Sequence, residues 1–194
     1  MPLENAKKAE EKERFEEISY DQLVDRIVNG QTLFQDILVK PQEDIPIKTY
    51  HKFIGYLVMR QPQLEFQRSV MKGIYLANLP LNLRLNDVFL GEANFQESDI
   101  KLTALDVYFG DANFKRSNLN RAFFIDTYLV GARFDDADLT EAAITHSSFF
   151  KSEVQDTSYP IFTGANVRGV TIEGKPYQEF DAFDKALFED AIDE

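Results

Sequence analysis

The residues of this chain that could perform acid–base chemistry are closely spaced carboxylates and two histidines. A pair such as Asp135 and Asp136 could supply the general acid and base of glycoside hydrolysis if a cleft desolvated one carboxyl group. The pairs occupy positions that we expect to face solvent on a convex surface. His51 and His146 are the only histidines, and the absence of cysteine excludes disulfides, thiolate nucleophiles and cysteine-based metal sites. We therefore expect no enzymatic activity, no cofactor and no metal ion.

Composition and charge favour a folded protein. The 194 residues are 44% hydrophobic and 28% charged, with a net charge of −12, which argues against a disordered chain. The acidic balance disfavours direct binding to nucleic acid. No apolar run is long enough to span a bilayer, and the N-terminus is too charged for a signal peptide. We therefore expect a cytoplasmic protein that does not contact a membrane.

Residues 1–72 form the first of three expected parts and are predicted to be an α-helical N-terminal capping region. Ser19 and Gln22 match a capping box at the start of a short amphipathic helix, and Gly30 is placed to end it. Two prolines in residues 40–46 indicate a loop. Further helices are expected at 5–18, 48–59 and 64–71.

The second part, residues 73–176, contains an internal repeat with a period of five. Every fifth position is large and apolar, through Phe109, Phe114, Leu119, Phe124, Leu129, Phe134, Leu139, Ile144, Phe149, Val154 and Tyr159. The residue two places before each of these is small in nearly every case, as at Ala112, Ser117, Ala122, Thr127, Ala132 and Ala137. So long a run favours a true structural repeat over chance.

The repeat also continues on both sides of this run. Upstream it passes through Leu85, Leu90, Phe95, Ile100 and Leu105, and the frame then slips by one position between Leu105 and Phe109. Ile74 and Leu79 resemble an opening turn, while Phe162, Val167 and Ile172 resemble a closing one. The repeat therefore covers about residues 74–172.

A period of five fits neither a helix nor a strand, so the chain must turn at every unit. We expect a coil of four short sides. The large residue of each unit points to the axis and stacks on its equivalent in the next coil, and the small residue two places earlier also points inward. The other three positions face water.

The units GDANF, RSNLN, VGARF, DDADL and TEAAI resemble the pentapeptide-repeat family, whose pattern is small, Asp or Asn, Leu or Phe, polar, any residue. The resemblance implies a mainly β fold, a right-handed quadrilateral β-helix of about 20 residues per coil and about five coils, with a rise of about 4.8 Å per coil. This sequence departs from the Asp/Asn position of the pattern at Tyr108, Phe123, Tyr128, Arg133 and Glu153.

An apolar strip is expected on the outside of the β-helix, because residues one coil apart should stack vertically. Its members form the candidate partner patch: Tyr108, Phe123, Ile125, Tyr128, Val130 and Phe150. Exposed apolar surface of this kind often marks a partner site. The alternative is that the tyrosine phenols merely shelter the corners, or that the N-terminal helices or the C-terminal tail fold back over the strip.

Charge is expected in two blocks on the other faces. The basic block is Lys115, Arg116, Arg121 and Arg133; the candidate acidic patch is Asp135, Asp136, Asp138, Glu141, Glu153 and Asp156. Some relatives in the family resemble DNA in charge and inhibit type II topoisomerases. Mimicry of DNA needs carboxylates along the whole rod, and the basic block interrupts them, so an ordinary solvated face is the simpler interpretation.

The third part, residues 177–194, is an acidic tail that could form an amphipathic helix. Its apolar positions are Phe180, Phe183, Leu187, Phe188 and Ile192. Their spacing would place them on one side of a helix. This side could cover the last coil of a monomer or join two chains in a dimer.

We hypothesise from the sequence a non-enzymatic protein–protein interaction scaffold whose protein partner is not identified. The alternative is a DNA-mimicking modulator of a type II topoisomerase such as gyrase. The family is abundant in cyanobacteria and most of its members have no assigned function, so the resemblance supports architecture more than activity.

Overall fold

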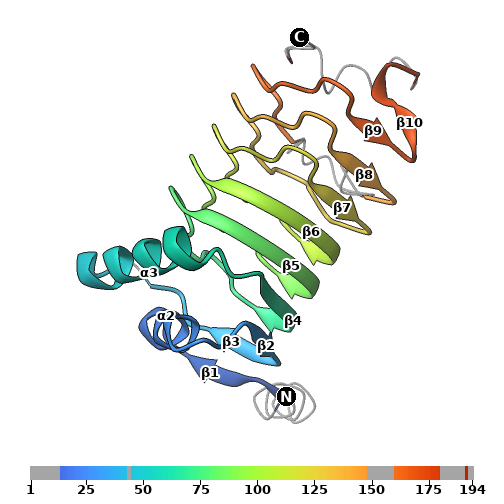
Figure 1. Cartoon of the computed structure of the whole chain (residues 1–194). Helices are drawn as coiled ribbons and strands as arrows, with labels where there is room; N and C mark the ends of the chain where they lie inside the picture. Colours follow the sequence, from blue (N-terminus) through green and yellow to red (C-terminus); the bar gives the residue numbers. More distant parts are fainter. Residues whose placement is uncertain (1–13, 43–44, 148–159, 180–190, 192–194) are drawn as a thin grey trace.

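The computed structural model describes residues 14–42, 45–147, 160–179 and 191, and within them the fold is mainly β (Figure 1). Two α-helices and a series of strands are present in these residues. The helices are α2 (Tyr20–Val28) and α3 (Ile47–Arg60). The strands are β1 (Glu16–Ile18), β2 (Leu33–Gln35), β3 (Ile37–Val39), β4 (Leu64–Val70), β5 (Pro80–Phe89), β6 (Asp99–Tyr108), β7 (Phe123–Ile125), β8 (Ala143–Thr145), β9 (Thr171–Ile172) and β10 (Lys175–Pro176), and a 3-10 turn, η1, follows at Tyr177–Glu179.

Parallel pairing between successive coils runs along the molecule from β4 to β9. In the first coils Leu64 pairs with Leu83 and Pro80 with Asp99. In the next, Phe123 pairs with Thr103 on one side and with Ala143 on the other, so each of these coils is longer by a single position. Ala143 then pairs with Thr171, a still longer step that spans the undescribed segment 148–159. The chain therefore stacks as a β-helix whose coils lengthen toward the C-terminus.

Stacked phenylalanines fill the interior of the β-helix. The rings of Phe95, Phe114, Phe134 and Phe162 form one column, with neighbouring ring centroids 4.8, 5.0 and 4.9 Å apart and nearly parallel planes. All four rings are buried. Their spacing equals the distance between paired strands, so the side chains repeat at the same rise as the backbone. The predicted large residues from Phe109 to Ile144 are likewise buried, which confirms the repeat over that range.

Left-handed backbone at residues other than glycine produces the corners. In the regular coils from Phe109 to Ile144, a backbone bond closes the turn at three of the four corners, as where the Ala112 amide donates to the Phe109 carbonyl (3.0 Å) and Asp111 between them has a φ of 57°. This is the arrangement of a type II turn. Asn113 and Asn118 accept a bond from the amide two residues later, which explains the Asp/Asn position of the repeat unit.

The fourth corner carries the residues from Asp87 through Asp106 and Asp126 to His146, which also have positive φ. No backbone bond closes the turn at Asp126. Instead the Thr127 amide donates to the Ser147 hydroxyl of the next coil (3.2 Å). The long strands β5 and β6 bend at this corner, at Asp87 and Asp106 respectively.

The N-terminal region departs from the helical prediction in several places. The segment 64–71 is strand β4, and residues 16–18 at the end of the helix predicted for 5–18 are strand β1; residues 5–13 lie outside the described part. The helix predicted at 48–59 is α3, and Ser19 and Gln22 form the capping box of α2. A purely helical region 1–72 is therefore wrong in the described residues, since strands β1 to β4 extend the sheet on that side of the repeat.

The frame slip also lies elsewhere than predicted. Leu102 and Ala104 point inward at 5% and 0% exposure, whereas Leu105, which was predicted to point inward, is 40% exposed, and Thr103, two places before it, is also exposed. The slip therefore falls between Ile100 and Ala104. The reason is that β6 runs straight through this stretch, so every second position points inward there.

Candidate protein-interaction surface

An exterior ladder of aromatic rings runs beside the fourth corner. The rings of Phe89 and Tyr108 stack with centroids 4.5 Å apart and planes within 5°, and those of Tyr108 and Tyr128 stack at 4.5 Å and 9°. Val70 precedes Phe89 in the same column of paired residues. The predicted stacking of Tyr108 and Tyr128 is confirmed. Phe89 is not predicted from the sequence, because the coil from Phe89 to Tyr108 is shorter than the coil from Tyr108 to Tyr128.

Two glycines make room for these rings. A Cβ at Gly110 would lie 2.5 Å from the Tyr108 hydroxyl oxygen, and a Cβ at Gly91 would lie 2.9 Å from the Phe89 ring and 3.0 Å from the Tyr108 ring. The rings therefore lie flat along the backbone two residues further on. Burial raises the pKa of the Tyr108 phenol, with Tyr128 and Asp111 adding to the shift. Tyr108 is therefore protonated at neutral pH and can donate a hydrogen bond.

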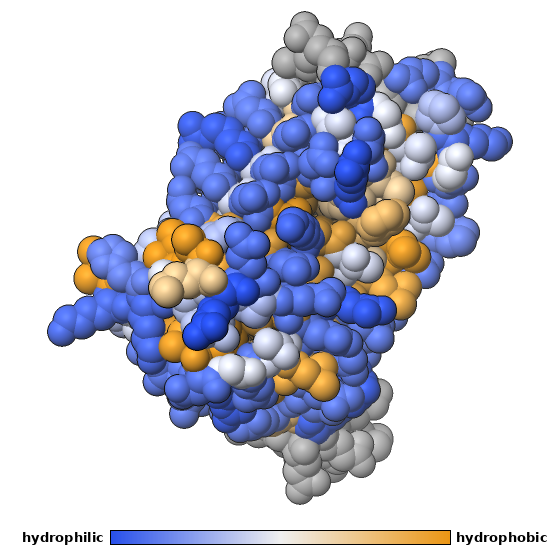
Figure 2. All heavy atoms as spheres, in the orientation of Figure 1, coloured by the Kyte–Doolittle hydropathy of each residue, from blue (hydrophilic) through white to orange (hydrophobic). Residues whose placement is uncertain are grey.

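A second apolar group lies on the other side of the fourth corner. Leu105 is 40% exposed and Phe123 is 48% exposed, and Ile125 is half-buried. Leu105 pairs with Ile125 across neighbouring strands. Figure 2 shows apolar surface gathered over the middle of the β-helix, in the region of β5 to β7. The apolar strip predicted from the sequence is therefore two columns with a corner between them.

The predicted partner patch needs two amendments. Val130 is only 7% exposed, so it supports the surface from beneath and offers little area to a partner. Phe150 lies outside the described residues. Phe89 and Leu105 are exposed members of this surface that the repeat pattern does not predict, and the register of the strands identifies them.

Neither described helix covers the aromatic ladder. α2 and α3 pack against each other through Tyr20 and Phe53, and the Tyr50 hydroxyl of α3 donates to the Ala77 carbonyl (3.3 Å). In Figure 1 both helices lie to the left of the strands, while the arrowheads of β5 to β8 lie to the right. Phe89 consequently keeps 36% of its surface exposed. The alternative that the N-terminal helices fold back over the strip is not seen in the described residues, and the tail at 180–190 lies outside them.

Carboxylates occupy the corner between the two apolar columns. Asp87, Asp106 and Asp126 stand one above the other on successive coils, and all three are exposed. Below them, Arg68 donates two hydrogen bonds to Asp36, of 2.8 and 2.6 Å. Those bonds lower the pKa of Asp36. The corner therefore presents a line of negative charge beside the aromatic ladder.

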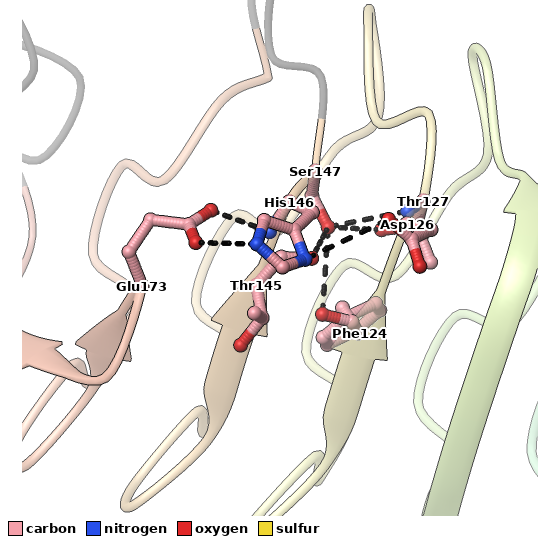
Figure 3. Close-up of polar contacts among 7 residues, drawn as sticks. All are labelled: Phe124, Asp126, Thr127, Thr145, His146, Ser147 and Glu173. Carbon is pink, nitrogen blue, oxygen red and sulfur yellow. Dashed lines mark hydrogen bonds and ion pairs between the residues drawn. The ribbon is translucent and has the colours of Figure 1, made fainter.

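His146 ends this line of residues (Figure 3). Its Nδ1 lies 3.8 Å from a carboxylate oxygen of Asp126, and its Nε2 lies 3.5 Å from one of Glu173. The Glu173 carboxylate also accepts the backbone amide of His146. At the equivalent position one coil earlier, the Asp126 amide donates to the Thr145 carbonyl of the following coil (2.9 Å). At His146 the Glu173 carboxylate accepts the amide in place of such a carbonyl.

The hydroxyl groups near His146 are engaged with the backbone and with each other. Ser147 lies 2.8 Å from the Thr127 hydroxyl and donates toward the Thr145 carbonyl (3.1 Å). Among the residues drawn in Figure 3, no hydroxyl group is hydrogen-bonded to the imidazole. The arrangement closes a corner of the β-helix and lacks the contact between nucleophile and base that acyl transfer requires.

The candidate acidic patch is divided by ion pairs. Asp135 pairs with Arg133 at 3.1 Å and Glu141 pairs with Arg121 at 2.7 Å, while Asp138 accepts bonds from the Thr140 amide and hydroxyl. Asp136 is exposed at a corner; Glu153 and Asp156 lie outside the described residues. Of the basic block, Arg116 also pairs with Glu97, at 2.5 Å.

The described residues contain no group of three or more histidine and acidic side chains that could hold a metal ion. A depression beside Phe123 is lined by polar and basic groups that include Asn82, Lys101, Asn120 and Arg121. It contains no carboxylate. No helix of the described residues is long and apolar enough to cross a membrane.

Comparison with known proteins supports the repeat. Residues 108–145 match the family model of pentapeptide repeats in eight copies. Comparison with curated proteins gives no match. Similar solved structures include QnrB1, a plasmid-mediated fluoroquinolone resistance protein, at 12% identity and a TM-score of 0.47 over 81% of this chain and 77% of that one.

Two cyanobacterial structures are also similar. The pentapeptide-repeat protein Rfr23 from Cyanothece 51142 is 15% identical with a TM-score of 0.31, over 68% of this chain and 65% of that one. HetL from Nostoc sp. strain PCC 7120, a pentapeptide-repeat protein involved in heterocyst differentiation regulation, is 15% identical with a TM-score of 0.35, over 79% of this chain and 63% of that one.

Proposed function

We propose that this chain, whose residues 108–145 match the pentapeptide-repeat family model, acts as a non-enzymatic scaffold whose exterior aromatic ladder binds a partner protein. The observation that carries the proposal is the stack of Phe89, Tyr108 and Tyr128, which lies on the outside of the β-helix without a cover from either described helix. Aromatic residues at this density are typical of the centres of protein interfaces.

The ladder is preorganised for binding. Each ring is fixed by its neighbours at 4.5 Å, and Gly110 allows Tyr108 to lie against the backbone. A partner therefore buries apolar area without first ordering these side chains, which lowers the entropic cost of association. Tyrosine also offers a hydroxyl at the edge of its apolar face, so the same residues provide both area and hydrogen bonds.

The remaining parts of the chain support this surface in the proposed function. Residues 1–72 act as the N-terminal cap, with Leu23 and Ile27 of α2 buried in the hydrophobic core. Residues 177–194 cover the other end of a monomer or join two chains; Ala191 packs against the core. Covered ends prevent the open strand edges of a solenoid from associating.

A capture experiment compares baits that differ only on the surface. The wild type, a Tyr108→Ser, Tyr128→Ser double variant and a Met59→Ser control are immobilised and exposed to lysate of the source cells. Met59 is 82% exposed on α3, so its replacement removes exposed apolar area elsewhere. The proposal predicts a protein that the wild type and the control retain and the double variant loses.

Circular dichroism of the three baits checks that each is folded. Equal recovery of every captured protein by the double variant and the wild type would contradict the proposal. A protein lost by the Met59→Ser control alone would move the binding surface to α3.

The alternative function, a DNA-mimicking modulator of gyrase, is less well supported because of the distribution of charge on the β-helix. Arg121 and Arg133 pair with carboxylates of the candidate acidic patch, and these cations interrupt a track of negative charge such as phosphates would form. A gyrase supercoiling assay tests the alternative directly. We expect no inhibition by the wild-type protein.

A further inference from the structure

We propose that the partner presents a basic amphipathic helix, whose apolar stripe packs on the aromatic ladder while its arginine or lysine stripe faces the corner carboxylates. The inference rests on the proposed function, because it uses the same ladder of Phe89, Tyr108 and Tyr128. It adds the chemistry of the partner. The docking surface is the apolar ladder, and charge complementarity at its edge selects the occupant.

Each ring of the ladder has a carboxylate two residues before it. Asp87 precedes Phe89, and Asp106 and Asp126 precede the two tyrosines in the same way. The residue between carboxylate and ring points inward, as Val88 and Val107 do at 2% exposure. The outer surface therefore carries two parallel columns, one aromatic and one acidic, that repeat together with every coil.

The carboxylates are available to a partner to different degrees. Asp106 makes no ion pair among the described residues, and Asp87 lies in the field of Arg68, which is itself bound to Asp36. Asp126 faces His146 at 3.8 Å. On the far edge of the ladder, Lys72 is paired with Glu92 at 2.8 Å. The net field along the ladder is therefore negative, which favours a basic partner.

The distance between successive coils along the two columns is close to the rise of one turn of an α-helix. The stacked rings are 4.5 Å apart outside the β-helix and 4.8 to 5.0 Å apart inside it, so three successive coils span about 9 to 10 Å. Two turns of an α-helix span about 10.8 Å. Alternate side chains of a strand would span about 13 Å over the same three contacts. A helix along the coil axis therefore keeps both columns in register better than a strand does.

Such a helix places its apolar stripe on the aromatic column and its neighbouring basic stripe on the acidic column. Residues three and four apart share one side of a helix, so leucines on one stripe reach the rings and arginines on the next reach the carboxylates. Arginine also stacks on aromatic rings and pairs with carboxylates through two donors. A second copy of this chain is a weaker occupant, because its net charge of −12 would oppose the corner carboxylates.

The test uses synthetic helical peptides, each about six turns long, and the full-length protein. One labelled peptide carries a leucine stripe beside an arginine stripe, and a second replaces every arginine with glutamate. Binding is followed by fluorescence anisotropy at low and at physiological salt. We expect the arginine peptide to bind and the glutamate peptide to bind at least tenfold more weakly, with an affinity for the arginine peptide that falls as salt rises.

Protein variants assign the charge effect to the corner. Asp87→Asn, Asp106→Asn and Asp126→Asn are combined, because asparagine tolerates the positive φ of these positions. The matched control combines Glu97→Gln, Asp136→Asn and Glu141→Gln, which removes three charges from other corners with positive φ. We expect the first variant to lose about tenfold in affinity for the arginine peptide and to lose most of the salt dependence, and the control to bind like the wild type.

Several outcomes would overturn the inference. These are equal binding of both peptides, equal binding by both triple variants, or no binding of the arginine peptide at about 1 mM peptide, a concentration chosen to reveal affinities of about 10⁻³ M. The partner captured with the wild type separates the two proposals. If its binding depends on Tyr108 and Tyr128 but not on the three aspartates, the scaffold function stands and the basic helix is wrong. If it depends on neither set, both proposals fail.

Discussion

Two aromatic ladders run along the same β-helix, one inside it and one outside. The interior ladder of Phe95, Phe114, Phe134 and Phe162 and the exterior ladder of Phe89, Tyr108 and Tyr128 have nearly the same spacing and nearly parallel rings. They differ in what surrounds them. The interior rings are enclosed by the coils, whereas the exterior rings keep one edge in solvent beside a line of carboxylates.

The rings stack in both ladders because successive coils repeat at a constant rise. Burial decides whether the removal of a ring affects folding stability or partner binding. Any side chain repeated at the coil length lies within about 5 Å of its equivalent. Inside, removal of a ring leaves a cavity, and the cost is in folding stability. Outside, removal of a ring changes the surface offered to a partner. We therefore expect the two ladders to separate stability from binding.

The largest effect is expected from the interior ladder. Phe114→Ala removes a fully buried ring that stacks on both Phe95 and Phe134, and should lower the free energy of unfolding by about 3 to 5 kcal/mol. Phe123→Ala, at a ring that is 48% exposed, is the matched control and should cost about 1 kcal/mol or less. Urea denaturation followed by circular dichroism measures both, and equal costs would contradict the assignment of inside and outside.

The next effect comes from the glycine beneath the exterior ladder. Gly110→Ala places a methyl group against the Tyr108 ring, so the ring must shift, at a cost of about 1 to 3 kcal/mol. Partner binding should also weaken, although no aromatic residue is removed. Gly55→Ala is the control, since a Cβ there meets nothing within 4 Å in α3, and it should stabilise the fold by about 0.5 to 1 kcal/mol. Retained binding by Gly110→Ala would show that the position of the Tyr108 ring is unimportant.

A smaller effect is expected at the fourth corner, which lies between the two apolar columns. Ser147→Ala removes the hydroxyl that accepts the Thr127 amide, and this amide directly precedes Tyr128. The loss should be about 1 to 2 kcal/mol, since the buried donor is left without that partner. Ser147→Thr keeps a hydroxyl and should retain most of the stability. Equal losses in the two variants would argue that packing, and not the hydrogen bond, stabilises the corner.

The smallest effect concerns the ion pair below the carboxylate column. The hydrogen bonds from Arg68 lower the pKa of Asp36, so the unfolded chain binds a proton at higher pH than the folded one. The stabilisation is present above the ordinary aspartate pKa of about 4 and is lost as the pH falls through the lowered value. Arg68→Gln should therefore reduce the acid-induced loss of stability between about pH 4 and the lowered pKa. Identical pH profiles for the wild type and the variant would contradict this contribution.

The regular coils are the part of the fold that the sequence predicts best. From Phe109 to Ile144 each unit has a large and a small inward residue, and only a turn in every unit can bury both sets. In the shorter coils that precede this run, Leu85, Leu90, Phe95 and Ile100 are buried as predicted, and the prediction fails at Leu105 in β6. Thr103 and Leu105 fit the pattern of a small residue two places before a large one. Leu102 and Ala104, which point inward, reverse that order, so the residue types favour the wrong pair.

The strands before the repeat were harder to predict for a different reason. Leu64 and Phe66 of β4 are buried at alternate positions, but the strand bends at Arg68, which has a φ of 43°. The bend breaks the alternation after a few residues and leaves a spacing that a helix could also produce. The exterior ladder was predicted only in the coils of regular length, which gave Tyr108 and Tyr128 and missed Phe89.

The central claim is that the exterior ladder binds a partner while the interior ladder stabilises the fold. Isothermal titration calorimetry of the captured partner into the wild type, the Tyr108→Ser, Tyr128→Ser variant and the Met59→Ser control tests it most directly. We predict that the double variant stays folded and loses about 2 kcal/mol or more of binding free energy, roughly 30-fold in Kd, while the control binds as the wild type does. Equal affinity of a folded double variant and the wild type would contradict the claim.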